Sequence, residues 1–268
     1  MCQIALIWGE TAAPAAVAAR LLRLHPGRFD PQVVRETART MRGLNVGLPP
    51  FWIDQLARES GALPIIAERD RPLDALLLAS TFAELVDMKS TFTGSHSLRV
   101  ANLAGAMAAL DRQLLTAGVT VSEVILTALL HDLGKLAVPT TILDKQGPLT
   151  PEEWVIMRRH PADSALVINA VAPWGDLAVW AGAHHERVDG RGYHQGLVGD
   201  AIPPIGRLLA TADAFDAMIA DRPYRKGIAP EEALRRVRDD RGTQFDPLAA
   251  ELLETVVAQR NAASNGAA

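Results

Sequence analysis

Helical periodicity runs through almost the whole chain and constrains its fold more than any other feature of the sequence. Prolines and glycines separate the periodic segments, and no clean alternation of apolar and polar residues is present. The pattern predicts an all-α bundle. Apolar residues recur at steps of three and four residues, the spacing of one helix face, in segments 73–85, 98–110, 121–130, 154–171, 205–219 and 248–257.

One helix start can be placed directly from the sequence. Thr150 offers a capping hydroxyl, Pro151 suits the first helical position, and Glu153 stands where its carboxylate can reach back to the capping residue. We therefore expect a helix to begin at this point.

The cysteine and histidine counts limit the kind of metal site that the chain can build. Its 268 residues include a single cysteine, which excludes an intramolecular disulfide framework and any site with several cysteine ligands. A metal would therefore have to be held by carboxylates and by some of the seven histidines. Hydrophobic residues make up 49% of the chain, enough for a real core in one large domain, with or without an accessory segment.

Charge and targeting signals narrow the partners and the location. The net charge of −4 argues against polymeric nucleic acid or an anionic membrane surface as a partner, but not against a small phosphate pocket. The first ten residues lack the basic and apolar regions of a signal peptide, and no apolar run is long enough to cross a bilayer. We expect a cytoplasmic protein.

The first candidate site follows an apolar helical segment. His131 and Asp132 end the segment 124–130, and Lys135 lies four residues after His131. Ionisable groups at the end of a core-facing helix cost desolvation energy unless they are paired or bind metal. A carboxylate beside an imidazole can hold a divalent ion, and Lys135 could reach a phosphate there. A capped helix end with a salt bridge is the alternative interpretation.

The second candidate site ends another apolar helix. His184 and His185 follow the segment 177–181 and lead into a loop that contains Gly190, Gly192 and Tyr193. Adjacent histidines at the end of a buried helix favour metal ligation, whereas on a surface turn they would have no such role.

Three single residues complete the set, and each could instead be an ordinary buried or exposed polar group. His96 opens a predicted helix, His160 closes the stretch 157–161, and Asp213 lies inside an apolar helix where an unpaired carboxylate is costly. Asp216, three residues further on, is either a surface residue or a partner that supports a ligand, and we favour the second.

Taken together, these motifs resemble those of the HD-GYP family, a branch of the HD phosphohydrolase superfamily. The likeness covers roughly residues 75–257. It implies an HD-type helical bundle with a small N-terminal helical segment, a di- or trinuclear centre of iron or manganese, and hydrolysis of cyclic di-GMP to pGpG or GMP. The matching segments are His131–Lys135, 149–153 with His160 and Pro161, 184–193, 213–217 and 222–225.

The resemblance also implies a role for each matching residue. Asp132 would bridge two metal ions, and it and Lys135, which would contact the scissile phosphate, would be the catalytic pair. Tyr193, Arg222 and Arg225 would bind substrate, although the two arginines could also form a solvated basic turn. The implied ligands of the first metal are His96, His131, Asp132 and Asp213; those of the second are Asp132, His160, His184 and His185.

Two divalent ions suit this chemistry independently of the resemblance. Such a pair can activate a water and stabilise the attacking and leaving oxygens of a phosphodiester. Imidazole and carboxylate ligands together suit iron and manganese, and basic side chains supply charge-assisted contacts to a dianionic dinucleotide. The pattern therefore predicts a metal-dependent phosphodiesterase.

The chain departs from the family pattern at three positions. Phe92 stands where trinuclear members carry a glutamate, so we expect two metal ions. His194 replaces the proline that follows the tyrosine, which we expect to loosen the loop. Ser164 stands in place of the usual glycine after the His-Pro pair, a change that we expect to matter little.

Two alternative functions are also consistent with part of the pattern. The same chemistry could act on another cyclic dinucleotide or on a nucleotide, because no residue visibly reads guanine edges. Alternatively, the altered loop and the N-terminal extension could make the chain a regulatory module that docks on a diguanylate cyclase. The intact set of ligand positions favours the enzyme.

The sequence also predicts a division of the chain. We expect an N-terminal helical accessory segment at 1–72, a catalytic domain at 73–260 and a disordered tail at 261–268. An ungapped likeness between 13–31 and 229–247 indicates that the first segment is a remnant of a degenerate repeat. The alternative is a helical extension that packs on the domain or forms a homodimer.

Overall fold

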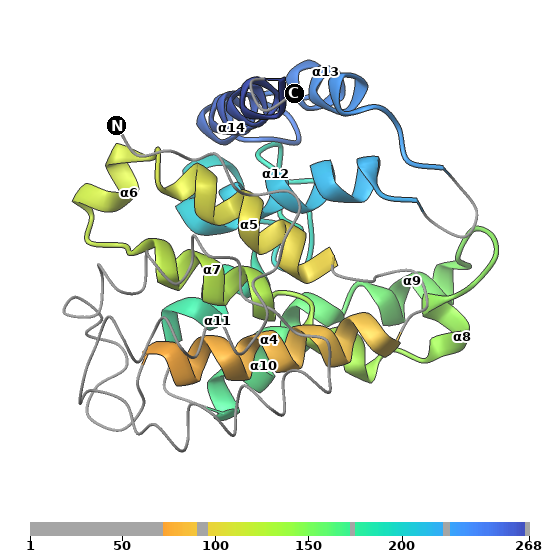
Figure 1. Ribbon diagram of the computed structural model, residues 1–268. Helices are drawn as coiled ribbons and strands as arrows, with labels where there is room; N and C mark the ends of the chain where they lie inside the picture. The colour runs from red at the N-terminus through yellow and green to blue at the C-terminus, as the bar shows by residue number, and fades with distance from the viewer. Residues whose placement is uncertain (1–71, 90–95, 172–174, 222–225, 266–268) are drawn as a thin grey trace. The chain divides into compact units, whose positions relative to one another are not determined.

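The fold is built from helices, as the periodicity predicts. The computed structural model describes residues 72–89, 96–171, 175–221 and 226–265, and these contain no β-strand (Figure 1). The α-helices are α4 (Pro72–Lys89), α5 (His96–Ala108), α6 (Arg112–Thr116), α7 (Val121–Leu130), α8 (Thr140–Leu143), α9 (Pro151–Met157), α10 (His160–Val171), α11 (Gly175–Gly182), α12 (Pro204–Ile219), α13 (Pro230–Asp239) and α14 (Pro247–Asn265), and the 3-10 helices are η1 (Leu133–Ala137) and η2 (Gly199–Ala201).

The chain divides into two compact units. Phe82–Val257 forms one, and Met1–Thr81 with Ala258–Ala268 forms the other. The structure describes the second unit only at 72–81 and 258–265. The expected repeat at 13–31 lies outside the described residues, as does all of the expected accessory segment except Pro72. The site described below belongs entirely to the first unit.

The core of this unit is a set of closely packed helices. α7 is buried along its whole length, and α5 packs against both α7 and α12 (Figure 1). Gly105 permits the close approach of α5 and α7, since a Cβ atom there would lie 2.8 Å from Cγ1 of Ile125. α10 packs on η1 and α11, and α11 in turn packs on α7 and α12. These helices therefore form one connected core.

Helix starts follow the local chemistry. α9 begins with the predicted capping box: the Thr150 hydroxyl accepts from the Glu153 amide, and the Glu153 carboxylate accepts from the Thr150 amide. This prediction is confirmed. A second capping box, formed by Thr120 and Glu123, starts α7 and was not identified in the sequence.

The periodic segment 154–171 is not one helix, as its pattern predicted, but two. α9 ends at Met157 and α10 begins at His160. In a continuous helix Pro161 would have no N–H to donate to the carbonyl of Met157, and its ring would clash with that carbonyl, which explains the break. His160 therefore opens a helix instead of closing one.

The C-terminal boundary also differs from the prediction. α14 continues through Asn265, beyond position 261, where we expected a disordered tail to begin. The extension is explained by composition, since no glycine or proline interrupts 248–265.

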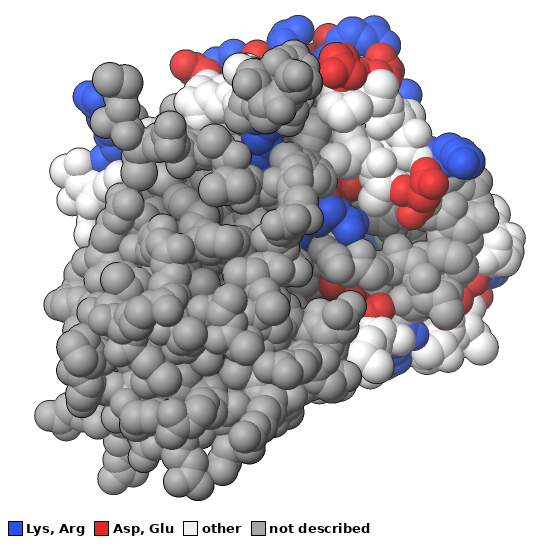
Figure 2. Space-filling model, in the orientation of Figure 1, with Lys and Arg blue, Asp and Glu red and all other residues white. Residues whose placement is uncertain are grey.

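Two surface properties bear on the partners. No helix of the described residues is long and apolar enough to span a membrane. α13 carries both signs of charge, with ion pairs from Glu232 to Arg235 and Arg236. Figure 2 shows both signs intermingled on the coloured part of the surface. The visible described surface therefore has no continuous basic face of the kind that binds polymeric nucleic acid.

Candidate metal centre

Three of the predicted ligands are oriented by the helix ends that carry them. His131, His160 and His184 are buried, and each Nδ1–H donates to the carbonyl oxygen three residues earlier. A carbonyl can only accept, so the neutral form of each ring leaves Nε2 with a free lone pair. These hydrogen bonds are His131 to Ala128 at 2.6 Å, His160 to Met157 at 2.7 Å and His184 to Ala181 at 2.6 Å.

A fourth imidazole is oriented across two helices. His96, the first residue of α5, has its Nδ1 2.7 Å from Oδ2 of Asp216 on α12. Arg99 donates to the same carboxylate through Nε at 2.7 Å and through its terminal nitrogen at 2.9 Å. Asp216 is fully buried. Asp216 is therefore not a surface residue, and it contacts His96, one of the predicted ligands.

Asp132 stands between two groups of imidazoles. Its Oδ2 lies 3.3 Å from Nε2 of His131 and 3.8 Å from Nε2 of His96. Its Oδ1 lies 3.3 Å from Nε2 of His160 and 3.7 Å from Nε2 of His184. Each carboxylate oxygen thus faces a different group, which is the arrangement that a bridging ligand needs.

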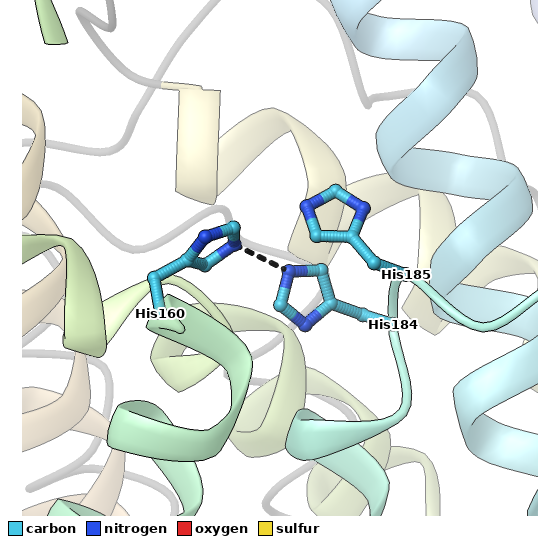
Figure 3. Close-up of side chains that lie close together, drawn as sticks. All are labelled: His160, His184 and His185. Carbon is cyan, nitrogen blue, oxygen red and sulfur yellow. Dashed lines mark hydrogen bonds between the residues drawn. The ribbon is translucent and has the colours of Figure 1, made fainter. Parts of the chain in front are cut away.

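The closest approach of two histidines indicates how well this region fits a cation. Nε2 of His160 lies 3.2 Å from Nε2 of His184, shown as the dashed line in Figure 3. Burial lowers the pKa of His160 to about 3 and holds the pKa of His184 well below its usual range. Both rings are therefore neutral near pH 7, and both present lone pairs to the same space. A divalent ion satisfies such a pair of acceptors.

Two buried atoms near this space support the same conclusion. Nε2 of His131 and Oδ1 of Asp132 make no hydrogen bond. A buried acceptor without a partner costs free energy unless an ion or water occupies its position. Sets of ligand atoms that lie within 4.8 Å of one another are His160, His184 and His185; His96, His131 and Asp213; and His131, Asp132 and His184.

Asp213 lies between His96 and His185. One of its oxygens lies 3.1 Å from Nε2 of His96, and the other lies 4.0 Å from Nδ1 of His185. Burial opposes the charge on His96, but the carboxylates of Asp213 and Asp216 outweigh it and raise the pKa of His96 to about 9. Burial also lowers the pKa of His185, to about 4. His185 is thus neutral near pH 7, like His160 and His184, whereas His96 carries a proton that the ionised carboxylates of Asp213 and Asp216 stabilise.

A cavity of about 760 Å³ opens beside these residues. Lys135, predicted to contact a phosphate, lines it and donates from Nζ to Oδ2 of Asp132 at 2.5 Å. Tyr193 also lines it, with its ring centroid 4.8 Å from that of His185. Burial raises the pKa of Tyr193, so its hydroxyl keeps its proton and can donate a hydrogen bond. Cavities of this volume accommodate small organic ligands.

The loop that carries Tyr193 is held by a buried carboxylate. Glu186, which is 2% exposed, accepts from the amides of Gln195 at 2.7 Å, Gly196 at 3.2 Å and Leu197 at 2.9 Å. These bonds fix the residues that directly follow His194. We expected the loss of proline to loosen the loop, but in the structure these three hydrogen bonds to Glu186 hold it.

Ser164 has a larger role than we expected. Its side chain is fully buried, and its hydroxyl accepts from the amide of Gly134 at 2.8 Å, which joins α10 to η1. At Gly134 a Cβ atom would lie 2.1 Å from the carbonyl oxygen of His160. This close contact brings the His131–Asp132 pair beside His160.

The structure brings most of the predicted site residues together, but not all of them lie in its described part. Phe92, on which the expectation of two metals depends, and the predicted substrate-binding residues Arg222 and Arg225 lie outside the described residues. Sequence reasoning missed Arg99, Glu186 and the role of Ser164. The periodicity held no signal for them, since each acts through a contact with a residue distant in the chain or through the shape of a loop. The predicted residues that are brought together are His96, His131, Asp132, Lys135, His160, His184, His185, Tyr193 and Asp213.

Comparison with known proteins identifies the family. A sequence profile described as the HD domain matches residues 80–248, more than half of the chain. The chain belongs to the HD domain family. The resemblance inferred from its motifs is thereby confirmed, and the fold of α-helices agrees with it.

Several curated proteins are similar to this member of the HD domain family. The 3'3'-cGAMP-specific phosphodiesterase 3 of Vibrio cholerae is 36% identical over 225 residues, covering 82% of this chain and 47% of that protein. The cyclic di-GMP phosphodiesterase PA4108 of Pseudomonas aeruginosa is 42% identical over 166 residues, covering 61% of this chain and 39% of that protein. The chain thus spans less than half of the length of each relative.

One solved structure shares the fold. It is an HD-type protein from Bdellovibrio bacteriovorus, Bd1817, with a TM-score of 0.55 and 14% sequence identity, covering 91% of this chain and 78% of that one. At this level of identity the likeness concerns the arrangement of helices alone.

Proposed function

We propose that the chain is a metal-dependent phosphodiesterase that hydrolyses a cyclic dinucleotide, with cyclic di-GMP as the first candidate substrate and pGpG, GMP or both as products. The observation that carries the proposal is the position of Asp132, with one oxygen toward His131 and His96 and the other toward His160 and His184, beside a ligand-sized cavity. An isolated structural metal would not require a carboxylate that faces two groups of imidazoles.

The ligand sets are those that the family resemblance implies, and the distances around Asp132 support them. Two divalent ions, iron or manganese, would supply water activation and charge stabilisation for phosphodiester cleavage. The pairing of neutral imidazoles with carboxylates suits both metals. The residues that would hold the first ion are His96, His131, Asp132 and Asp213, and those for the second are Asp132, His160, His184 and His185.

The other polar residues of the cavity would bind the substrate. Lys135 Nζ lies beside Asp132 on the cavity wall, so its charge can pair with the scissile phosphate. Tyr193 retains its proton and can donate to a phosphate oxygen. Arg222 and Arg225 remain predicted phosphate contacts.

A second candidate substrate is 3'3'-cGAMP. It is supported by the 36% identity to a Vibrio cholerae phosphodiesterase named for that dinucleotide. Cyclic di-GMP is supported by the 42% identity over a shorter segment. Docking on a diguanylate cyclase, a homodimer and a cytoplasmic location remain predictions from the sequence.

The test uses the full chain, stripped of metal and reloaded anaerobically with Fe or Mn. We expect two metal ions per chain and release of pGpG or GMP from cyclic di-GMP, measured by elemental analysis and by chromatography of the products. 3'3'-cGAMP is assayed in parallel, and the ratio of kcat/KM values assigns the preferred substrate. A metal-loaded chain that cleaves no cyclic dinucleotide would contradict the proposal, and three ions per chain would contradict the dinuclear assignment.

A further inference from the structure

The wall of the cavity beyond Tyr193 carries an aromatic and cationic stack. The guanidinium carbon of Arg158 lies 5.4 Å from the ring centroid of Trp154 and 5.4 Å from that of Tyr193. All three side chains line the cavity. Trp154 belongs to α9, Arg158 follows that helix, and Tyr193 belongs to the loop fastened by Glu186.

This stack leads away from the metal ligands. The Tyr193 ring is 4.8 Å from the His185 ring, and Arg158 and then Trp154 follow in successive contacts. A ligand whose phosphate lies at Asp132 and Lys135 would therefore have its remaining bulk beside Arg158 and Trp154. A mononucleotide would leave this outer wall bare, whereas a dinucleotide has a second base and a second phosphate to place there.

Packing does not account for these two side chains. α9 has no buried residue, and Trp154 is 43% exposed. Within the described residues no carboxylate forms an ion pair with Arg158, whereas its neighbour Arg159 pairs with Asp163 at 3.7 Å. An exposed indole beside an uncompensated guanidinium on a cavity wall is the combination that nucleotides require, a flat apolar face for the base and a forked donor for the phosphate.

We propose that Trp154 and Arg158 form the subsite for the outer nucleotide of a cyclic dinucleotide, in which the indole stacks on the base and the guanidinium binds the phosphate that is not cleaved. This inference rests on the proposed function and names specificity-determining residues for it. Stacking on an aromatic ring tolerates any base, so the subsite selects dinucleotides over smaller phosphodiesters and does not distinguish guanine from adenine.

The experiment compares two substrates on the same metal-loaded chain. Bis(p-nitrophenyl) phosphate is a phosphodiester without a nucleotide, and cyclic di-GMP has both nucleotides. We expect Trp154→Ala and Arg158→Ala each to lower kcat/KM for cyclic di-GMP about tenfold more than for the small diester, mainly through KM. Trp154→Phe retains a stacking face and should recover most of the loss.

Neighbouring residues provide matched controls. Val155, which is 67% exposed, and Arg159 are not among the residues that line the cavity, so Val155→Ala and Arg159→Ala should leave the ratio of the two substrates unchanged. Equal losses on both substrates in the Trp154 and Arg158 variants, or no loss on either, would overturn the inference.

A binding measurement separates this inference from the proposed function. Calorimetric titration of metal-loaded chain with cyclic di-GMP should show affinity about tenfold weaker in Trp154→Ala and Arg158→Ala than in the unmodified chain. If the unmodified chain cleaves the small diester but no cyclic dinucleotide, the proposed function fails, and the titration still decides the subsite. Equal affinities in all variants, or no binding by the unmodified chain, would overturn the subsite.

Discussion

At the inner end of the cavity the imidazoles of His131, His160 and His184 are buried, and each donates to the carbonyl three residues earlier in the chain. At the outer end Trp154 and Arg158 are exposed and contact each other above a surface helix. The inner residues are held in place by backbone that is already folded. The outer residues keep more freedom, so a ligand would complete their arrangement. The side chains that would bind a metal are thus held in fixed positions, whereas the side chains that would meet the substrate can adjust to it.

The largest expected effect is at Asp132, whose two oxygens face the two groups of imidazoles. Asp132→Asn preserves the size of the side chain but removes the charge that faces both groups. We expect both metal content and turnover to fall by more than about 100-fold, since the proposed bridging ligand is lost. Elemental analysis and product chromatography measure the two effects. Asp176→Asn, at an exposed position of α11, is the control, and normal metal content in Asp132→Asn would refute the bridging role.

A smaller effect is expected at Asp216, which contacts the predicted ligand His96. Asp216→Asn weakens the support of His96 and leaves Arg99 without its bidentate partner. We expect a loss of about 10- to 100-fold in metal affinity or activity, the range typical of residues that orient a ligand. Competition with a chromogenic chelator measures the affinity. Asp200→Asn, which affects a fully exposed carboxylate paired with Arg207, should have no effect.

The loop that links the two ends provides the next comparison. Glu186→Ala leaves the amides of Gln195, Gly196 and Leu197 without their acceptor, which we expect to lower the free energy of unfolding by about 1–3 kcal/mol. KM should rise because Tyr193 lies on the same loop, while metal content stays the same. Urea unfolding and steady-state kinetics are the measurements. An unchanged unfolding curve, compared with the exposed control Glu251→Ala, would show that the loop does not depend on this carboxylate.

The smallest effect tests the packing beneath the inner end. Ser164→Ala removes the acceptor of the Gly134 amide, which we expect to cost about 0.5–1.5 kcal/mol of unfolding free energy. Activity should stay within about threefold, because α10 still packs on η1. Thermal unfolding followed by circular dichroism checks the stability. A loss of activity as large as that of Asp216→Asn would mean that this hydrogen bond positions His160 and does more than stabilise the packing.

Local chemistry made much of the fold and of the inner site predictable. Apolar periodicity identified the helical segments, and the capping box at Thr150 is where the pattern placed it. The histidines were recognisable as candidate metal ligands because ionisable residues at the ends of apolar helices cost free energy when they have no partner. Their orientation is also local, since each ring bonds a carbonyl three residues earlier.

Other features depended on contacts that no local pattern encodes. The break before His160 was hidden because apolar periodicity continued through it, and only the geometry of Pro161 interrupts the helix. The pairing of Arg99 with Asp216 joins positions 117 residues apart, and the stack of Arg158 on Tyr193 joins a helix end to a loop.

The sequence was sufficient to specify helices and the residues able to hold a metal, because hydrogen-bonding and burial rules act over a few residues. The tertiary structure decided which residues face one another: Asp132 between two groups of imidazoles, and Trp154 with Arg158 on the outer wall. These contacts depend on how whole helices pack, and packing depends on side-chain shape across segments that are far apart in the chain.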